Sequence, residues 1–120
     1  MYVITKTFTF EAAHHLNNVP EGHKCRRPHG HSYRVVMELQ AEALDTRGFV
    51  VDYTDLGPVK DWIDFHWDHQ DLNAVEAGVE TTAENLAKVL FDRFKLMYPQ
   101  LTAVTVCETA KTTATYRGRR

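Results

Sequence analysis

The sequence has only two cysteines, Cys25 and Cys107, and they lie far apart in the chain. Two cysteines allow at most one disulfide, which excludes the disulfide-rich scaffold of a small secreted protein. No apolar run approaches the roughly 20 residues that a membrane-spanning helix needs. The N-terminal stretch MYVITKTFTF alternates apolar and polar side chains and lacks the uninterrupted apolar segment of a signal peptide. We therefore expect a cytoplasmic protein with reduced thiols and no membrane association.

An excess of charge of one sign is also absent. The chain carries 14 lysines and arginines against 16 aspartates and glutamates, a formal net charge of −2. This balance lacks the strongly basic character of a nucleic-acid-binding protein, so we expect no nucleic-acid partner. At 120 residues, 43% of them hydrophobic, the sequence suits one globular domain over residues 1–120 with a modest core. Self-association would bury more apolar surface.

Histidine, by contrast, is unusually frequent, and every histidine precedes residue 70. The seven are His14, His15, His23, His29, His31, His66 and His69. Imidazole is the commonest metal ligand in proteins, so this clustering favours a metal site.

Two long strands are predicted in the first part of the chain. Apolar and polar side chains alternate over residues 2–14, with Phe8 and Phe10 on the apolar face and His14 at the same parity. A loop rich in Asn, Pro and Gly follows. A second alternating strand is expected from residue 29 or 31 to about residue 41.

In the middle of the chain, the sequence pattern predicts a turn at residues 45–48, a short strand at residues 49–51 and a helix capped by Asp52. The apolar positions that recur at helical spacing in this helix are Leu56, Val59 and Ile63.

A second helix has the clearest pattern. Thr81 and Glu84 fit a capping box at its start, and Pro99 ends it. Its apolar stripe consists of Leu86, Leu90, Phe94 and Met97. Two further strands are expected at residues 101–109 and 112–117. Long strands with segregated helices predict an α+β protein whose antiparallel sheet carries both helices on one face.

The candidate metal ligands follow from strand parity. His29 and His31 are two residues apart, so on a strand both rings project to one side, and Gly30 leaves room between them. His14 is the best third candidate, while His15, His23 and His66 would substitute if the register differs. Imidazole favours zinc among the common metals, and three histidines leave the open coordination position of a catalytic site. The alternative is that His29 and His31 are solvated residues near a loop end.

Other residues could carry proton-transfer chemistry. Cys25 is flanked by Lys24, Arg26 and Arg27, and cationic neighbours favour the reactive thiolate; the alternative is an unreactive loop cysteine. The adjacent Asp68 and His69 could form a proton relay with Cys25.

Glu108 shares the parity of Val104 and Val106, so its carboxylate is either a solvated edge residue or a ligand anchor. Two basic groups, at residues 24–27 and 117–120, are either solvated surface or phosphate-binding residues.

These residues resemble a known family. The matching motifs are FEAAH at 10–14, CxxxHGH at 25–31, DH at 68–69 with LN at 72–73, TAENLA at 82–87, ET at 108–109 and YRG at 116–118. Together they resemble the 6-pyruvoyl tetrahydropterin synthase family over essentially the whole chain. The spacing in CxxxHGH is similar to that of the 6-carboxy-5,6,7,8-tetrahydropterin synthase branch, which acts in queuosine biosynthesis.

The resemblance implies a role for each candidate residue. The implied zinc ligands are His14, His29 and His31. Cys25 becomes the catalytic thiol, with Asp68 and His69 as its proton-relay partners. The residues implied to line the pterin pocket are Glu108, Thr81 and Thr82. Of these, Glu108 would accept hydrogen bonds from the amino-pyrimidine edge of the pterin.

The resemblance also implies a fold, an assembly and a reaction. The fold is the tunnelling fold, ββααββ, with a four-stranded antiparallel sheet and two helices on one face. The subunits usually form a homohexamer with sites at subunit interfaces. The reaction converts 7,8-dihydroneopterin triphosphate to 6-carboxytetrahydropterin, acetaldehyde and triphosphate, with zinc as cofactor. The alternatives are the 6-pyruvoyl tetrahydropterin synthase reaction, which eliminates triphosphate only, and a non-catalytic zinc- or pterin-binding module.

Overall fold

The computed structural model describes residues 1–118, and in this part of the chain five strands form one sheet in the order β3-β1-β2-β4-β5. The strands are β1 (Tyr2–His14), β2 (His29–Ala41), β3 (Gln70–Asp71), β4 (Leu101–Thr109) and β5 (Thr112–Arg117). The helices are α1 (Gly57–His66), α2 (Leu72–Val75) and α3 (Ala83–Phe94), with short 3-10 helices η1 (Lys24–Arg26) and η2 (Tyr53–Leu56). Arg119 and Arg120, members of the second basic group, lie outside the described residues.

The four predicted long strands are confirmed, and each pairs antiparallel with its neighbour. The sheet differs from the prediction by β3, a two-residue strand that runs parallel to the end of β1. The N–H of His69 donates to the carbonyl of Glu11 at 2.6 Å, and the N–H of Glu11 donates to the Asp68 carboxylate at 2.9 Å. These hydrogen bonds hold the chain after α1 against the open edge of β1.

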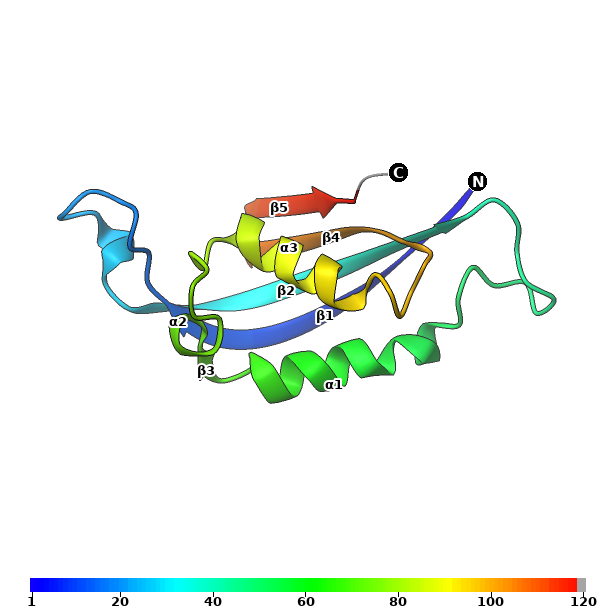
Figure 1. Cartoon of the computed structure of the whole chain (residues 1–120), viewed down its shortest axis with the longest axis horizontal. Helices are drawn as coiled ribbons and strands as arrows, with labels where there is room; N and C mark the ends of the chain where they lie inside the picture. Colours follow the sequence, from blue (N-terminus) through cyan, green and yellow to red (C-terminus); the bar gives the residue numbers. More distant parts are fainter. Residues whose placement is uncertain (119–120) are drawn as a thin grey trace.

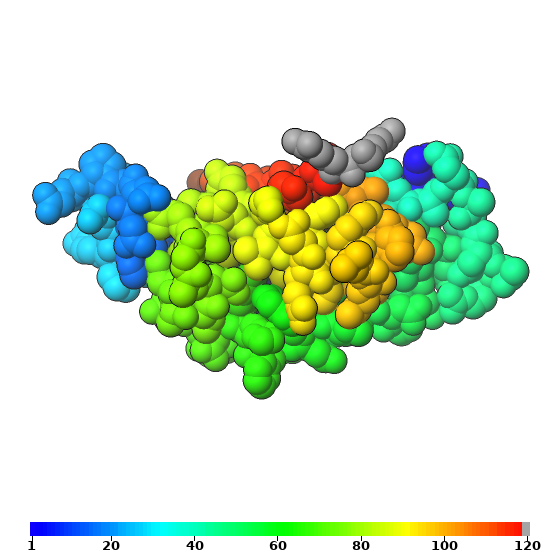
Figure 2. Space-filling view, viewed as in Figure 1, coloured from blue at the N-terminus to red at the C-terminus, as the bar shows by residue number. Residues whose placement is uncertain are grey.

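Helices α1 and α3 cover one face of the sheet, as predicted, with α1 against β1 and α3 against β4 and β5 (Figure 1). The loop between β1 and β2 is not covered by them and projects beyond the end of the sheet (Figures 1 and 2). Within residues 1–118, none of the helices has the length and apolar character needed to cross a membrane.

The core lies between this face and the helices, where alternate strand residues meet the apolar helix stripes. Phe10 of β1 stacks on its cross-strand partner Tyr33 of β2, with ring centroids 4.7 Å apart. The side chains of Val35, Met37, Leu39, Leu56, Val59, Leu86 and Leu90 have no exposed surface. The alternating pattern of β1 and β2 therefore points one set of side chains, including His14, toward the helices.

The predicted short strand at residues 49–51 is wrong. The Asp45 carboxylate accepts hydrogen bonds from the N–H groups of Arg47 and Phe49, and the Asp45 N–H donates to the Phe49 carbonyl at 2.9 Å. These bonds close the predicted turn around Gly48, which has a φ of 91°. The Phe49 backbone is thereby occupied locally and joins no neighbouring strand.

The start and end of the second helix also differ from the prediction. Thr82 is the N-cap of α3, and its side chain accepts a hydrogen bond from the Asn85 N–H at 3.2 Å. The capping box of Thr81 with Glu84 is therefore wrong by one position, because Thr81 is fully buried and turned toward His14. The helix ends at Phe94, so Met97 lies beyond it and is exposed.

Truncation of Leu90 in α3 should test this core. Leu90→Ala is expected to lower the free energy of unfolding by about 2–5 kcal/mol, because it leaves a cavity where a buried side chain was. Leu96→Ala is the matched control, since the Leu96 side chain is 94% exposed and its removal should change little. Urea denaturation at one protein concentration measures both variants. Equal losses in the two variants would contradict the packing described.

Candidate metal centre and active site

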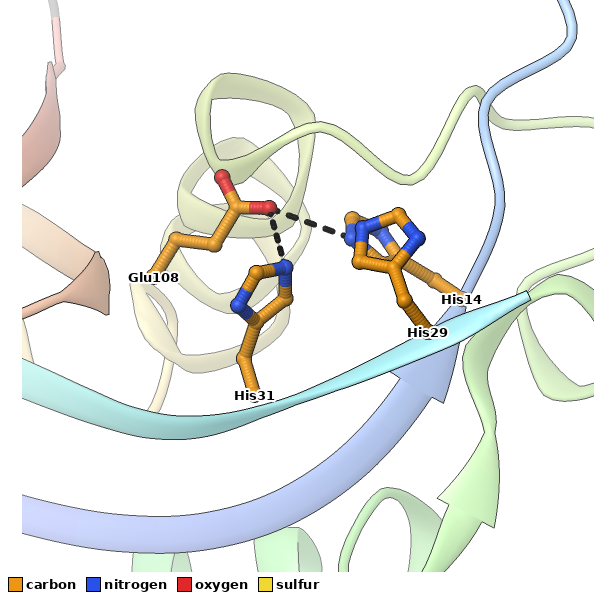
Figure 3. A group of neighbouring side chains, drawn as sticks. All are labelled: His14, His29, His31 and Glu108. Carbon is orange, nitrogen blue, oxygen red and sulfur yellow. Dashed lines mark ion pairs between the residues drawn. The ribbon is translucent and has the colours of Figure 1, made fainter. Parts of the chain in front are cut away.

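Four side chains that could hold a metal ion meet at one end of the sheet (Figure 3). His14 ends β1, and in the antiparallel register it lies opposite His29, the first residue of β2. His31 follows two residues later on the same face, and Glu108 comes from β4. Strand parity thus positions all three predicted histidines, and β4 adds a carboxylate that the sequence had not placed with them. His15, His23 and His66 lie outside this group.

The donor atoms of His14, His29, His31 and Glu108 all lie within 4.8 Å of one another. Glu108 Oε1 lies 2.8 Å from His31 Nε2 and 3.1 Å from His14 Nε2. The His14 side chain is only 1% exposed. A zinc ion binds imidazole nitrogen and carboxylate oxygen at about 2.0–2.2 Å, so donor atoms this close can share one ion.

Backbone carbonyls determine which ring nitrogen carries the hydrogen in two of the histidines. His14 Nδ1 lies 2.8 Å from the Thr81 carbonyl oxygen, and His29 Nδ1 lies 2.7 Å from the Arg27 carbonyl oxygen. A carbonyl only accepts hydrogen bonds, so Nδ1 must carry the proton in both rings. In the neutral ring the Nε2 atom is then left with a lone pair, the arrangement typical of histidine metal ligands.

Unpartnered polar atoms mark the same place. Among the described residues, the buried side-chain nitrogen and oxygen atoms without a hydrogen-bond partner are His14 Nε2, His31 Nε2 and the Tyr33 hydroxyl. Tyr33 follows His31 on the same strand face, with ring centroids 5.4 Å apart. Burial lowers the pKa of His31, and the nearby Glu108 carboxylate opposes this effect in part. The lowered pKa favours the neutral form of the ring, which is the form that binds a metal ion. The residues present therefore fit a bound metal ion.

The electrostatic state of Glu108 is set by the same cluster. With the histidines of the cluster protonated, contact with the His14 ring, reinforced by His31 and His29, holds the pKa of Glu108 below its usual range even though burial acts in the opposite direction. Glu108 is therefore ionised at neutral pH. The sequence offered two readings of this residue, a solvated edge residue or a ligand anchor, and its half-buried position among the histidines excludes the first.

The two predicted pocket threonines have separate structural tasks. Thr81 is fully buried, with its hydroxyl 3.2 Å from His14 Nδ1 and its carbonyl bonded to the same nitrogen. Thr82 caps α3. The chain before α3 therefore fixes the orientation of the His14 ring.

Asp68 and His69 form a pair at the edge of β1. Asp68 Oδ2 accepts from His69 Nδ1 at 2.8 Å. The hydrogen bond from the Glu11 N–H, followed by that from His69, lowers the pKa of Asp68. His69 has a φ of 57°, a left-handed conformation that side-chain-bearing residues adopt rarely and that is enriched at functional sites. His69 and His31 both line a cavity of about 550 Å³ beside the end of β1.

Cys25 lies apart from these groups, in η1 of the loop between β1 and β2. Both cysteines are free, Cys25 half-buried and Cys107 buried. Within residues 1–118, the hydrogen bonds of Asp68 and His69 do not involve the Cys25 thiol. One chain therefore assembles the histidine cluster and, separately, the Asp68–His69 pair, and that pair makes no hydrogen bond to the Cys25 thiol.

Two charged residues hold the Cys25 loop in place: Glu80, which the sequence did not single out, and Arg26, which it placed beside Cys25 in the first basic group. The Glu80 carboxylate accepts hydrogen bonds from the backbone N–H groups of Asn17 at 3.0 Å and Asn18 at 2.6 Å. Arg26 donates to the carbonyls of Asn17 and Val19 at 2.9 and 2.7 Å. Arg26, although exposed, is thus engaged with the backbone of its own loop. No local pattern could have predicted the Glu80 contacts, because they join residues more than 60 positions apart.

A sheet with helices on one face and a histidine cluster at the end of β1 and β2 defines a tunnelling-fold protein with a candidate metal centre. The family model described as 6-pyruvoyl tetrahydropterin synthase matches residues 3–119, so the chain belongs to that family of pterin synthases.

Individual relatives carry the names of two different pterin synthases. A 6-carboxy-5,6,7,8-tetrahydropterin synthase from Synechocystis sp. is 38% identical over 97% of this chain and 93% of its own length. The human 6-pyruvoyl tetrahydrobiopterin synthase is 29% identical over 96% of this chain and 90% of its own length. The solved structure of the Caenorhabditis elegans 6-pyruvoyl tetrahydropterin synthase superposes with a TM-score of 0.87 at 27% identity, covering 98% of this chain and 96% of its own.

Proposed function

We propose that this protein is a zinc-dependent 6-carboxy-5,6,7,8-tetrahydropterin synthase. With water as the second reactant, it would convert 7,8-dihydroneopterin triphosphate to 6-carboxytetrahydropterin, releasing acetaldehyde and triphosphate. The observation that carries the proposal is the cluster of three histidines, two with their Nε2 atoms freed for a metal by backbone carbonyls. The Synechocystis relative of the same name, which matches almost the whole chain, supports the choice of branch.

The proposed zinc ligands are His14, His29 and His31. Bound there, zinc would supply Lewis-acid polarisation to the side-chain hydroxyls of the substrate. Cys25 would transfer protons at the pterin and its side chain, and the pair of Asp68 and His69 would carry the opposite transfer. The hydrogen bond from His69 Nδ1 to Asp68 supports this role, because it leaves proton transfer to the other nitrogen of a ring that is 78% exposed.

The pterin would be held by the groups near α3. Glu108 would accept hydrogen bonds from the amino-pyrimidine edge of the pterin, with Thr81 and Thr82 beside it. A carboxylate that stays ionised at neutral pH is suited to accepting two such bonds.

We propose that the active site is completed in a homohexamer, at subunit interfaces. The Cys25 loop projects beyond the end of the sheet (Figure 1), and its thiol is not hydrogen-bonded to Asp68 or His69 of the same chain. A neighbouring subunit seated at that end of the sheet would bring a second set of side chains to the thiol.

Product identification tests the reaction. Zinc-loaded protein incubated with 7,8-dihydroneopterin triphosphate is expected to yield 6-carboxytetrahydropterin and acetaldehyde, detected by mass spectrometry. A pyruvoyl product would instead assign the reaction named in the human relative, in which the carbon chain is kept. Zinc binding without any turnover would indicate a non-catalytic zinc- or pterin-binding module and would reject the synthase proposal.

A further inference from the structure

Glu108 lies inside the histidine cluster, where a residue that only anchors a pterin has no reason to be. In Figure 3 its carboxylate points toward the rings of His14 and His31, with ion-pair contacts to both. The same oxygen, Oε1, makes the 3.1 Å contact with His14 Nε2 and the 2.8 Å contact with His31 Nε2. One carboxylate oxygen thus lies within contact distance of two of the three nitrogens that form the candidate metal site.

These contacts require a cation. Because His14 donates through Nδ1 to the Thr81 carbonyl, its Nε2 atom is an acceptor in the neutral ring. The Glu108 carboxylate is also an acceptor. Two acceptor atoms 3.1 Å apart repel each other unless a proton or a metal ion lies between them.

The geometry favours a metal ion over a proton. Despite their short contacts with Glu108, His14 Nε2 and His31 Nε2 are not aligned with it as hydrogen-bond donors and remain without a partner. Hydrogen bonds demand alignment, whereas ligands of one ion point at a shared centre and not at one another. Four donor atoms within 4.8 Å, three nitrogens and one oxygen, match the number and type of ligands that zinc takes.

Charge supports the same arrangement. Three neutral imidazoles leave the two positive charges of a zinc ion uncompensated in a site where His14 is almost fully buried. The Glu108 carboxylate neutralises half of that charge. Glu108 is half-buried and approaches the cluster from the side of β4, while the histidines come from β1 and β2, so its withdrawal would not require the histidines to move.

We propose that Glu108 is a fourth, displaceable metal ligand, which binds the ion in the absence of substrate and is released when a pterin binds. The release rests on the proposed function, in which Glu108 would bind the amino-pyrimidine edge of the pterin and zinc held by His14, His29 and His31 would polarise the side-chain hydroxyls of the substrate. Until a pterin binds, Glu108 would shield the bound ion from unrelated ligands.

Metal affinity tests the ligand role without any substrate. In competition with a chromophoric chelator, Glu108→Gln is expected to bind zinc at least about 10-fold more weakly than the unmodified protein. Glu84→Gln is the matched control, because Glu84 is exposed in the first turn of α3 and should leave the affinity unchanged. Far-UV circular dichroism checks that each variant is folded. Unchanged zinc affinity in folded Glu108→Gln overturns the proposal.

Substitution of cobalt(II) for zinc tests whether Glu108 leaves the metal when a pterin binds. In the Cys25→Ala background, chosen because turnover is expected to be slow there, the visible absorption of the cobalt-loaded protein is expected to shift when 7,8-dihydroneopterin is added. The variant that also carries Glu108→Gln should start from a different spectrum. A pterin that binds without changing the cobalt spectrum overturns the proposed release of Glu108 from the metal.

The two proposals can fail separately. If Glu108→Gln weakens zinc binding but the unmodified protein yields no pterin product, Glu108 remains assigned as a metal ligand and the proposed synthase function is rejected.

Discussion

Replacing Cys25 with alanine is expected to lower turnover of 7,8-dihydroneopterin triphosphate by about 10²–10⁴-fold while the protein keeps its zinc. This is the range over which one positioned acid–base group accelerates a reaction. Zinc should be retained because Cys25 is not among the four side chains that form the metal cluster. Initial rates of product formation and the zinc content per chain together measure the effect.

The second cysteine provides a matched control for this variant. Cys107 lies in β4 and is 4% exposed, so its thiol has no access to a substrate. Cys107→Ala should keep turnover within a few-fold of the unmodified protein. If Cys25→Ala retained full turnover, the thiol would have no part in the reaction. If both variants lost activity equally, the loss would reflect folding and not chemistry.

Replacing His29 with alanine is expected to remove both the metal and the activity. His29 is one of three histidines in the cluster, and its Nδ1 is already committed to the Arg27 carbonyl, which leaves Nε2 for the ion. Zinc affinity should fall by about 100-fold or more, since even residues that only support a ligand change metal affinity by 10–100-fold. Zinc content after dialysis against a chelator and turnover of the same sample measure the loss.

His66→Ala is the control for His29→Ala. His66 is exposed at the end of α1 and lies outside the metal cluster. This variant should bind zinc and turn over substrate like the unmodified protein. Full zinc occupancy in His29→Ala would remove His29 from the ligand set and would return His15 or His23 to consideration.

Strand parity was enough to predict much of the fold and of the histidine cluster. The alternation of β1 places His14 on the face of Phe8 and Phe10, and the two-residue spacing places His29 with His31. These predictions hold in the folded protein because the alternation of side chains along a strand determines which face of the sheet each one points to. The pairing of His14 with His29 then needed only an antiparallel register.

Features set by contacts between distant residues could not be predicted in the same way. Thr81 is a good N-cap by its sequence, yet its neighbour Thr82 takes that place because His14, 67 positions away, holds Thr81. Strand β3 forms only because Asp68 and His69 bond to Glu11. The parity of Glu108 predicted its face, but its approach to the histidines depends on how β4 packs beside β2.

Two adjacent residues before α3 support the thiol loop and the metal ligand at the same time. Glu80 holds the backbone of the loop at Asn17 and Asn18, and Thr81 holds the ring of His14. Because one peptide unit anchors both, a displacement of this short segment moves the loop and the histidine in the same direction. We therefore expect the thermal motions of the two to be correlated, and the separation between the Cys25 thiol and the histidine cluster to vary less than the mobility of an exposed loop alone would allow.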